Sequence, residues 1–168
     1  MLVLDAIERI EVSVRSRWAY TLAHQYHSSH PHLESDLFKQ EWNYQQNKEK
    51  LREEVNRNKK NEAFIKHFSD TYAEELPPIW AVCEVMTLSL LSQRFGNLRH
   101  GQDHNRIAHV YGMDERILTS FLRHLSLIRN VGAHHSRLWN REFTVTFQLP
   151  RGHPVGLYAC FNLKWEYL

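Results

Sequence analysis

Residues 4–22 read LDAIERIEVSVRSRWAYTL, and their apolar side chains recur at steps of three and four. The recurring positions are Leu4, Ile7, Ile10, Val14, Trp18 and Leu22. Because an α-helix turns once in 3.6 residues, these steps place one apolar stripe along one helical face. Glu11 and Arg15 stand four residues apart, which is a favourable ion-pair spacing. The segment therefore predicts a long helix over about residues 3–26, ended by the turn-forming run SSHPH at 28–32.

Three further helices are expected in the first two thirds of the chain. The polar stretch 36–57 has few apolar anchors and predicts a weakly specified helix, and residues 61–75 predict a short one. Pro77 and Pro78 are compatible with a helix start, since proline is tolerated in a first turn. The run 79–96 after them is the most apolar, so we expect one helix there, at the centre of the core.

The last helices are marked by their ends. Residues 104–111 predict a short helix ended by Gly112. Asp114 is a candidate N-cap for the following helix, whose apolar positions run through residues 118–128. Both signals place a helix boundary between residues 111 and 115.

The C-terminal part is less regular. Residues 143–147, FTVTF, alternate apolar and polar side chains and predict an extended segment, whereas residues 155–168 fit a strand or a helix equally. Six Gly and five Pro in 168 residues are few for an all-β chain, and the length suits one domain. We therefore predict an all-α fold: one domain over residues 1–168, a single helical bundle with a short irregular or extended tail.

The composition excludes several classes of protein. The 21 Lys and Arg against 19 Asp and Glu give a formal charge of +2, which by itself does not indicate polyanion binding. Cys83 and Cys160 form no CxxC pair, which argues against a disulfide scaffold or a thiolate zinc site. No apolar run reaches the roughly 18 residues of a membrane span, and the start lacks a signal peptide's basic region. We expect a cytoplasmic protein without a metal or other cofactor.

The candidate chemistry lies in residues 121–141, FLRHLSLIRNVGAHHSRLWNR. Arg129 continues the apolar stripe of its helix, so we expect it at the edge of a buried or interfacial surface, beside an anion. His134 follows after Gly132 and Ala133, whose small size leaves room for a ligand or another backbone.

These residue types suit phosphodiester cleavage. The guanidinium of Arg129 can hold a phosphate through two hydrogen bonds, and imidazoles such as that of His134 exchange protons near neutral pH. Asn130 could orient the imidazole or a phosphate oxygen. On spacing alone, the structural alternative is favoured: Arg129 pairs with a core carboxylate such as Glu84, and His134 packs beside it.

Three segments, in order, resemble the Abi-like (abortive infection) family, a branch of the HEPN superfamily. They are residues 7–17, residues 78–90 and the specific stretch RNVGAHHSRLWNR at 129–141, and the match spans about residues 3–145. The resemblance implies a helical bundle that pairs as a homodimer. Longer family members begin with a further N-terminal segment and continue past RLWNR with more helix. Relative to them we expect a compact variant, an excised domain or a product truncated at both ends.

The resemblance also implies a phage-defence toxin that acts as a metal-independent endoribonuclease on RNA. Its site is an Arg-x4-6-His motif contributed by both protomers, in which a ribose 2′-OH attacks the adjacent phosphate. Here the motif falls on Arg129, Asn130 and His134, with His135 as a lesser candidate through the looser spacing. An antitoxin of unidentified type is an implied partner.

Two alternatives stay open. The first is a module of the same fold that binds RNA or a partner but does not cleave. The second is a metal hydrolase built on His24, His27, His30 and His32, although no Cys, Asp or Glu nearby completes the set. Exposed, non-ligating histidines are the simpler interpretation of this cluster.

Two other features have a structural and a functional interpretation. The basic run over residues 48–60 could follow an RNA backbone, but interleaved glutamates make a solvated helix face at least as plausible. Trp18 and Trp80 fall on apolar stripes and are expected in the core, as is Cys83. Trp139 could approach RNA, although the core is the favoured place for it as well.

Overall fold

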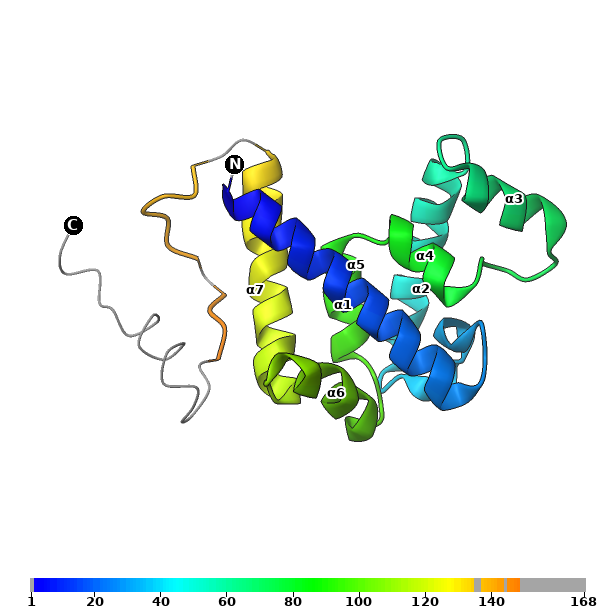
Figure 1. The fold of residues 1–168 in the computed structure, drawn as a ribbon, viewed down its shortest axis with the longest axis horizontal. Helices are drawn as coiled ribbons and strands as arrows, with labels where there is room; N and C mark the ends of the chain where they lie inside the picture. Colours follow the sequence, from blue (N-terminus) through cyan, green and yellow to red (C-terminus); the bar gives the residue numbers. More distant parts are fainter. Residues whose placement is uncertain (1, 135–136, 144, 149–168) are drawn as a thin grey trace.

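A computed structural model of the chain describes residues 2–134, 137–143 and 145–148. Within these residues the secondary structure is helical, in agreement with the all-α prediction (Figure 1). The α-helices are α1 (Leu2–Tyr26), α2 (Glu41–Asn58), α3 (Ala63–Thr71), α4 (Ile79–Val85), α5 (Leu88–Gly96), α6 (Gly101–Ala108) and α7 (Glu115–Ala133). The short 3-10 helices are η1 (Pro31–Leu33), η2 (Ser35–Leu37) and η3 (His109–Tyr111).

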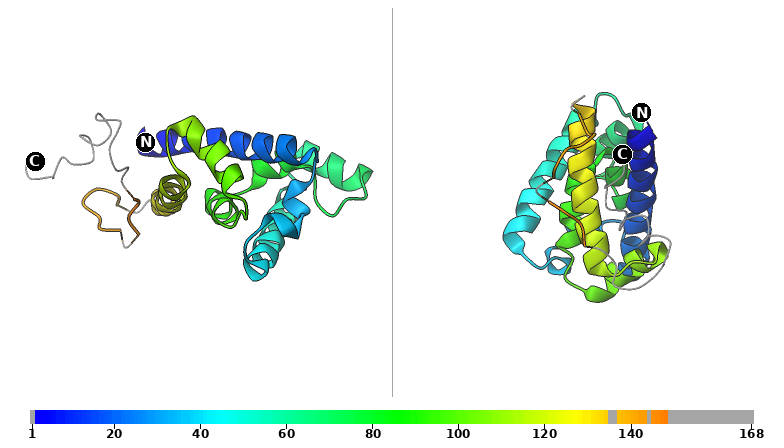
Figure 2. Two further views of the ribbon diagram at one scale, coloured as in Figure 1. Left: turned by 90° about the horizontal axis from the view of Figure 1, so that it is seen from below. Right: turned by 90° about the vertical axis from the view of Figure 1, so that its left-hand side faces the viewer.

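Helix α5 lies at the centre of the bundle, where it contacts α7, α2 and α1. Helix α1 extends along one side and contacts α7, α6 and α4, so it joins the two ends of the molecule (Figures 1 and 2). The N-terminal end of α1 lies beside the C-terminal end of α7, whereas α3 lies at the far end of the molecule (Figure 1). The first and last described helices therefore meet at one end of the bundle.

The periodicity of α1 predicts its buried face correctly. Ile7, Val14, Trp18 and Leu22 are buried in the core. The predicted ion pair between Glu11 and Arg15 is also formed, and Arg15 donates a second hydrogen bond to the carbonyl of Met86. Arg15 thereby ties α1 to the segment that joins α4 and α5.

The prediction of one helix over residues 79–96 is wrong, because the chain breaks between α4 and α5. Met86 and Thr87 adopt extended conformations, with ψ angles of 132° and 153°. The Thr87 side chain then caps α5 by accepting a hydrogen bond from the Leu90 amide at 3.2 Å. The Arg15 guanidinium donates a hydrogen bond to the Met86 carbonyl, so this carbonyl has a partner without a continuous helix. The apolar stripe through both halves is nevertheless buried in the core, as expected, at Ile79, Val82, Cys83, Met86 and Leu90.

Helices α2 and α3 are shorter than predicted. The stretch 38–40 ahead of α2 is extended rather than helical, and Phe38 pairs with Leu98 in an isolated antiparallel bridge. Helix α3 covers Ala63–Thr71, inside the predicted 61–75. Ahead of α2 the bridge between Phe38 and Leu98 replaces the predicted helix. After α3 the chain leaves the helix before it reaches Pro77 and Pro78.

The predicted signals around α6 and α7 are confirmed. Gly112 follows η3 with a φ of +64°, the left-handed conformation that favours glycine. The Asp114 carboxylate then accepts hydrogen bonds from the amides of Arg116 and Ile117, both at 2.8 Å. This cap starts the helix that carries the candidate site.

The described residues of the segment 143–148 form no strand. The segment lies along α7: the Val145 carbonyl is 2.5 Å from His124 Nδ1, and the Gln148 amide donates to Ser120 Oγ at 2.9 Å. Phe143 and Phe147 pack against the His124 ring, each with 5.4 Å between ring centroids. The segment thus contacts side chains of α7 and does not pair with a neighbouring strand. The open question of a strand or a helix over residues 155–168 lies outside the described residues.

The core contains an arginine that sequence reasoning did not find. Arg94 of α5 is 1% exposed, and its guanidinium lies 4.8 Å from the centroid of the Phe38 ring and 5.8 Å from that of Trp18. Its Nη2 donates to the His32 carbonyl at 2.5 Å, whereas Nε and Nη1 have no hydrogen-bond partner among the described residues. Burial lowers the pKa of Arg94 to about 10. Aromatic faces and one carbonyl therefore replace the carboxylate that usually accompanies a buried arginine.

Candidate functional site

Helix α7 carries the motif residues at its C-terminal end. Arg129 directly precedes the last turn, which contains Asn130, and His134 is the C-cap, whose amide donates to the Asn130 carbonyl at 3.2 Å. His135, the lesser candidate, lies outside the described residues. The helical register of the motif is thus continuous from Arg129 to His134.

Arg129, Asn130 and His134 are all exposed. The expectation that Arg129 borders a buried surface is wrong for the single chain. Residues 118, 122 and 125 of the same stripe are buried, but the stripe runs on to the free end of α7. No ion pair joins Arg129 to Glu84 or to another carboxylate in the described part of the chain, so the structural alternative is not supported.

Gly132 allows α1 to approach the end of α7 closely. A methyl group built on Gly132 would lie 2.8 Å from Leu4 Cδ2 and 3.5 Å from Leu138 Cδ1. The predicted space beside Gly132 therefore exists, and the Leu4 side chain occupies it. The candidate site lies where the first and last described helices touch.

The motif residues project from different sides of α7. At about 100° per residue, Arg129 and His134 are about 140° apart around the helix axis, whereas Asn130 and His134 are about 40° apart. A single chain therefore does not place the guanidinium of Arg129 and the imidazole of His134 on opposite sides of one phosphate.

The histidine cluster does not form a metal site in the described structure. His24 packs against Tyr20 with 4.1 Å between ring centroids, and Nδ1 of His30 is 2.8 Å from Ser29 Oγ. His32 is buried, contrary to the interpretation of this cluster as exposed, and burial lowers its pKa well below the usual value. Among the residues that the structure describes, no group of three or more His, Cys, Asp and Glu side chains could hold a metal ion.

The basic run at residues 48–60 is largely paired with carboxylates. Lys48 lies 2.6 Å from Glu75, and Lys59 lies 2.8 Å from Asp70. Arg52 and Arg57 form ion pairs as well, with Glu49, Glu75 and Glu54. This pairing favours the solvated helix face over an RNA-binding track.

The tryptophan predictions are confirmed only in part. Trp18 is fully buried, as expected. Trp80 and Trp139 were expected in the core but are 51% and 64% exposed. Trp42, on the first turn of α2, is 73% exposed. The exposed indoles of Trp42 and Trp80 are available for contacts outside the bundle.

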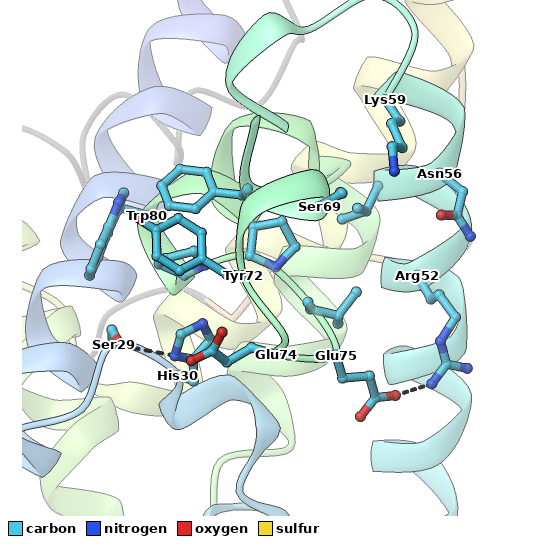
Figure 3. Close-up of a pocket in the computed structure, with 15 residues that line it drawn as sticks. Ser29, His30, Arg52, Asn56, Lys59, Ser69, Tyr72, Glu74, Glu75 and Trp80 are labelled. Carbon is cyan, nitrogen blue, oxygen red and sulfur yellow. Dashed lines mark hydrogen bonds and ion pairs between the residues drawn. The ribbon is translucent and has the colours of Figure 1, made fainter. Parts of the chain in front are cut away.

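Trp80 lines a cleft that the sequence did not indicate. The cleft, of about 430 Å³, lies between α2, α3 and the segment that leads into α4. In Figure 3 the rings of Tyr72 and Trp80 lie on one side, and the ion pair between Arg52 and Glu75 lies on the other. Among its charged groups Arg52 pairs with Glu75, and Phe68, Tyr72 and Trp80 give the cleft an aromatic wall.

The described chain is thus an all-α bundle with a polar, exposed Arg-Asn-His motif at the end of its last helix. The sequence matches the Abi-like protein family over residues 1–140, and the chain belongs to that family. Membership of this family associates the chain with abortive infection. Comparisons with the curated proteins and with the solved structures gave no match. Of the helices in the described residues, none has the length and apolar character to cross a membrane.

Proposed function

We propose that this protein is a phage-defence toxin that acts in the cytoplasm as a metal-independent endoribonuclease of the HEPN superfamily. The whole chain, residues 1–168, acts as one domain, with Arg129, Asn130 and His134 at its site and His135 as a lesser candidate. The observation that supports this proposal best is the state of Arg129. Arg129 is exposed near the C-terminal end of α7, as Asn130 and His134 are, and no carboxylate among the described residues neutralises its guanidinium.

The chemistry follows from these side chains. One imidazole takes the proton of a ribose 2′-OH as its oxygen attacks the adjacent phosphorus. The bond from phosphorus to the 5′-oxygen breaks, and a second imidazole donates a proton to that oxygen. Arginine side chains stabilise the negative charge that develops on the phosphorane-like transition state. The products are a 2′,3′-cyclic phosphate and a free 5′-hydroxyl.

The proposal requires two copies of the chain. Arg129 and His134 project from sides of α7 about 140° apart, so a second copy must supply groups that face the first. We therefore expect a homodimer in which both motifs contribute to one site. Light scattering at micromolar concentration measures the mass, and a persistent monomer would contradict this part of the proposal.

The test is incubation of the purified protein with a structured RNA in EDTA. We expect cleavage that leaves 2′,3′-cyclic phosphate ends and that is lost in Arg129→Ala and in His134→Ala. Arg116→Ala and His109→Ala are matched controls, because both residues are exposed and lie away from the C-terminal end of α7. These controls should cleave as the unchanged protein does.

The same experiment separates the alternatives. Cleavage that stops in EDTA would replace the proposal by a metal hydrolase. RNA bound without cleavage by a well-folded dimer would leave a binding module. An active toxin of this kind also needs a partner that restrains it, so we expect an antitoxin, whose type the sequence does not indicate.

A further inference from the structure

A second groove lies on the side of the bundle where α2, α5 and α7 face one another. Its volume is about 620 Å³, within the range of ligand-binding sites. We call it the amide groove, because six of its lining side chains are carboxamides of Asn and Gln. It also contains three cationic side chains, those of Lys39, Lys50 and Arg123. None of its described lining residues is Asp or Glu.

The cations of the amide groove are not neutralised. Lys39 and Arg123 are exposed, and neither forms an ion pair within the described residues. Lys50 donates a hydrogen bond to the Gln93 side-chain oxygen at 3.3 Å, which leaves its charge uncompensated. Lys50 differs in this from Lys48 and Lys59 of the same basic run, which carboxylates accompany. The amide groove therefore offers an anion three cationic side chains that no carboxylate of the described residues neutralises.

The groove is built on a hydrogen-bonded base. The Asn97 side chain accepts from the Gln40 amide at 3.1 Å and donates to the Gln40 carbonyl at 3.2 Å. The Lys39 amide donates to the Asn97 carbonyl at 2.7 Å. These bonds join the end of α5 to the start of α2, so the groove is formed before any ligand binds.

An aromatic side chain completes the lining. The Trp42 indole belongs to the groove and is 73% exposed, so one of its faces is available to a planar ligand. A surface with free cations, carboxamides and an exposed indole matches one type of polymer. Cations bind phosphates, carboxamides hydrogen-bond to base edges, and indoles stack on bases.

We propose that the amide groove binds single-stranded RNA. Its phosphates contact Lys39, Lys50 and Arg123, and one unpaired base stacks on Trp42. The occupant is single-stranded because stacking on the indole and pairing of base edges with carboxamides both require bases that are free of a duplex. This inference rests on the proposed function, for which it supplies the substrate path.

The groove leads toward the candidate site along α7. Its residues on this helix include Thr119, Arg123 and Ser126, at steps of four and three. The same helical face continues through Asn130 to His134, since steps of four follow each other on one side of a helix. The rise from Arg123 to Asn130 is about 10 Å. An RNA strand held in the groove thus reaches Asn130 and His134 by following α7.

The test measures binding separately from cleavage. The probe is a fluorescein-labelled 12-mer of 2′-O-methyl uridine, which has no 2′-OH to attack, and its anisotropy is followed with the full chain in EDTA. The groove variant Lys39→Gln/Lys50→Gln/Arg123→Gln is compared with a control, Lys60→Gln/Lys66→Gln/Arg116→Gln. Both variants change the formal charge from +2 to −1, and all the control residues are exposed and outside the groove.

We expect the groove variant to bind at least about tenfold more weakly at low salt. The slope of log affinity against log salt should become shallower by about 2, because each of three phosphate contacts on a single strand contributes about 0.7. The control variant should keep the slope of the unchanged protein. Trp42→Ala should weaken binding by roughly 5- to 150-fold, whereas Trp80→Ala, at another exposed tryptophan, should not.

Equal losses in the groove and control variants would overturn the inference, as would equal affinity for a duplex of the same length. The cleavage assay distinguishes this failure from that of the proposed function. If the groove variant binds and cleaves RNA as the unchanged protein does, only the groove is refuted. If the groove variant loses binding while the unchanged protein leaves RNA intact, only the nuclease is refuted.

Discussion

Replacing Arg94 by methionine and by alanine separates the packing of this buried side chain from its charge. The side chain is 1% exposed and contacts the rings of Phe38, Trp18 and Tyr44. Arg94→Ala leaves a cavity among these rings and should lower the free energy of unfolding by about 3–5 kcal/mol. For a chain of this length the melting temperature should fall by roughly 6–20 °C.

Arg94→Met should be tolerated much better. It removes the hydrogen bond to the His32 carbonyl, at a cost of about 1–3 kcal/mol, and the cation–π contacts, at a cost of about 0.5–2 kcal/mol. It also removes two buried nitrogen groups, Nε and Nη1, that have no partner among the described residues. Removing each of them should raise the free energy of unfolding by about 1–3 kcal/mol. These effects nearly cancel, so we expect a net change below about 1.5 kcal/mol.

The assay is urea unfolding followed by tryptophan fluorescence and by far-ultraviolet circular dichroism. Trp18 is a direct reporter, since its ring lies 5.8 Å from the guanidinium of Arg94. If Arg94→Met destabilises the protein as much as Arg94→Ala, the charge itself is the stabilising element and our reasoning is wrong.

Three further outcomes are expected. Burial lowers the pKa of His32 well below its usual value in the folded state, so the unfolded chain binds more protons below about pH 6.5. Stability should therefore fall as the pH drops from about 6.5 to 5, and a urea titration series should show a smaller loss in His32→Leu. Burial raises the pKa of the Cys83 thiol to about 12, so in a Cys160→Ser background Ellman's reagent at pH 8 should react only after urea is added; rapid reaction of the native protein would contradict this. Asp114→Ala should cost about 1 kcal/mol by removing the cap of α7, and Asp114→Asn should restore most of it; equal losses in urea unfolding would argue against the capping role.

Local patterns predicted the helices well where one face packs against the core. The apolar stripe of α1 and the Asp114 cap of α7 depend on neighbours three or four residues away, and both are confirmed. The break after Val85 depends instead on Arg15, which donates a hydrogen bond to the carbonyl of Met86, 71 residues further along the sequence. A local pattern contains no sign of such a contact.

Arg94 was missed because arginine is usually exposed. Its spacing did contain a signal, since it lies three and four residues after the buried Leu91 and Leu90. The reverse error concerns Arg129 and Trp80. Both continue apolar stripes, but each lies where no described helix covers that face. A stripe thus predicts the direction of a side chain, whereas its burial depends on what lies opposite.

The motif itself could be predicted from the sequence, but its arrangement could not. The Arg-x4-His spacing located Arg129 and His134, and the structure puts both on the surface at the end of α7. The amide groove draws its residues from α2, α5 and α7, so only the folded chain brings its cations together.

The contact between Gly132 and Leu4 has a consequence for evolution. The two positions lie at opposite ends of the described chain, yet a methyl group on one would meet the side chain of the other at 2.8 Å. Homologues that carry alanine or a larger residue at position 132 should therefore carry a smaller one at position 4. Covariation of this pair would record, across many genomes, that the first helix holds the end of the last one in place.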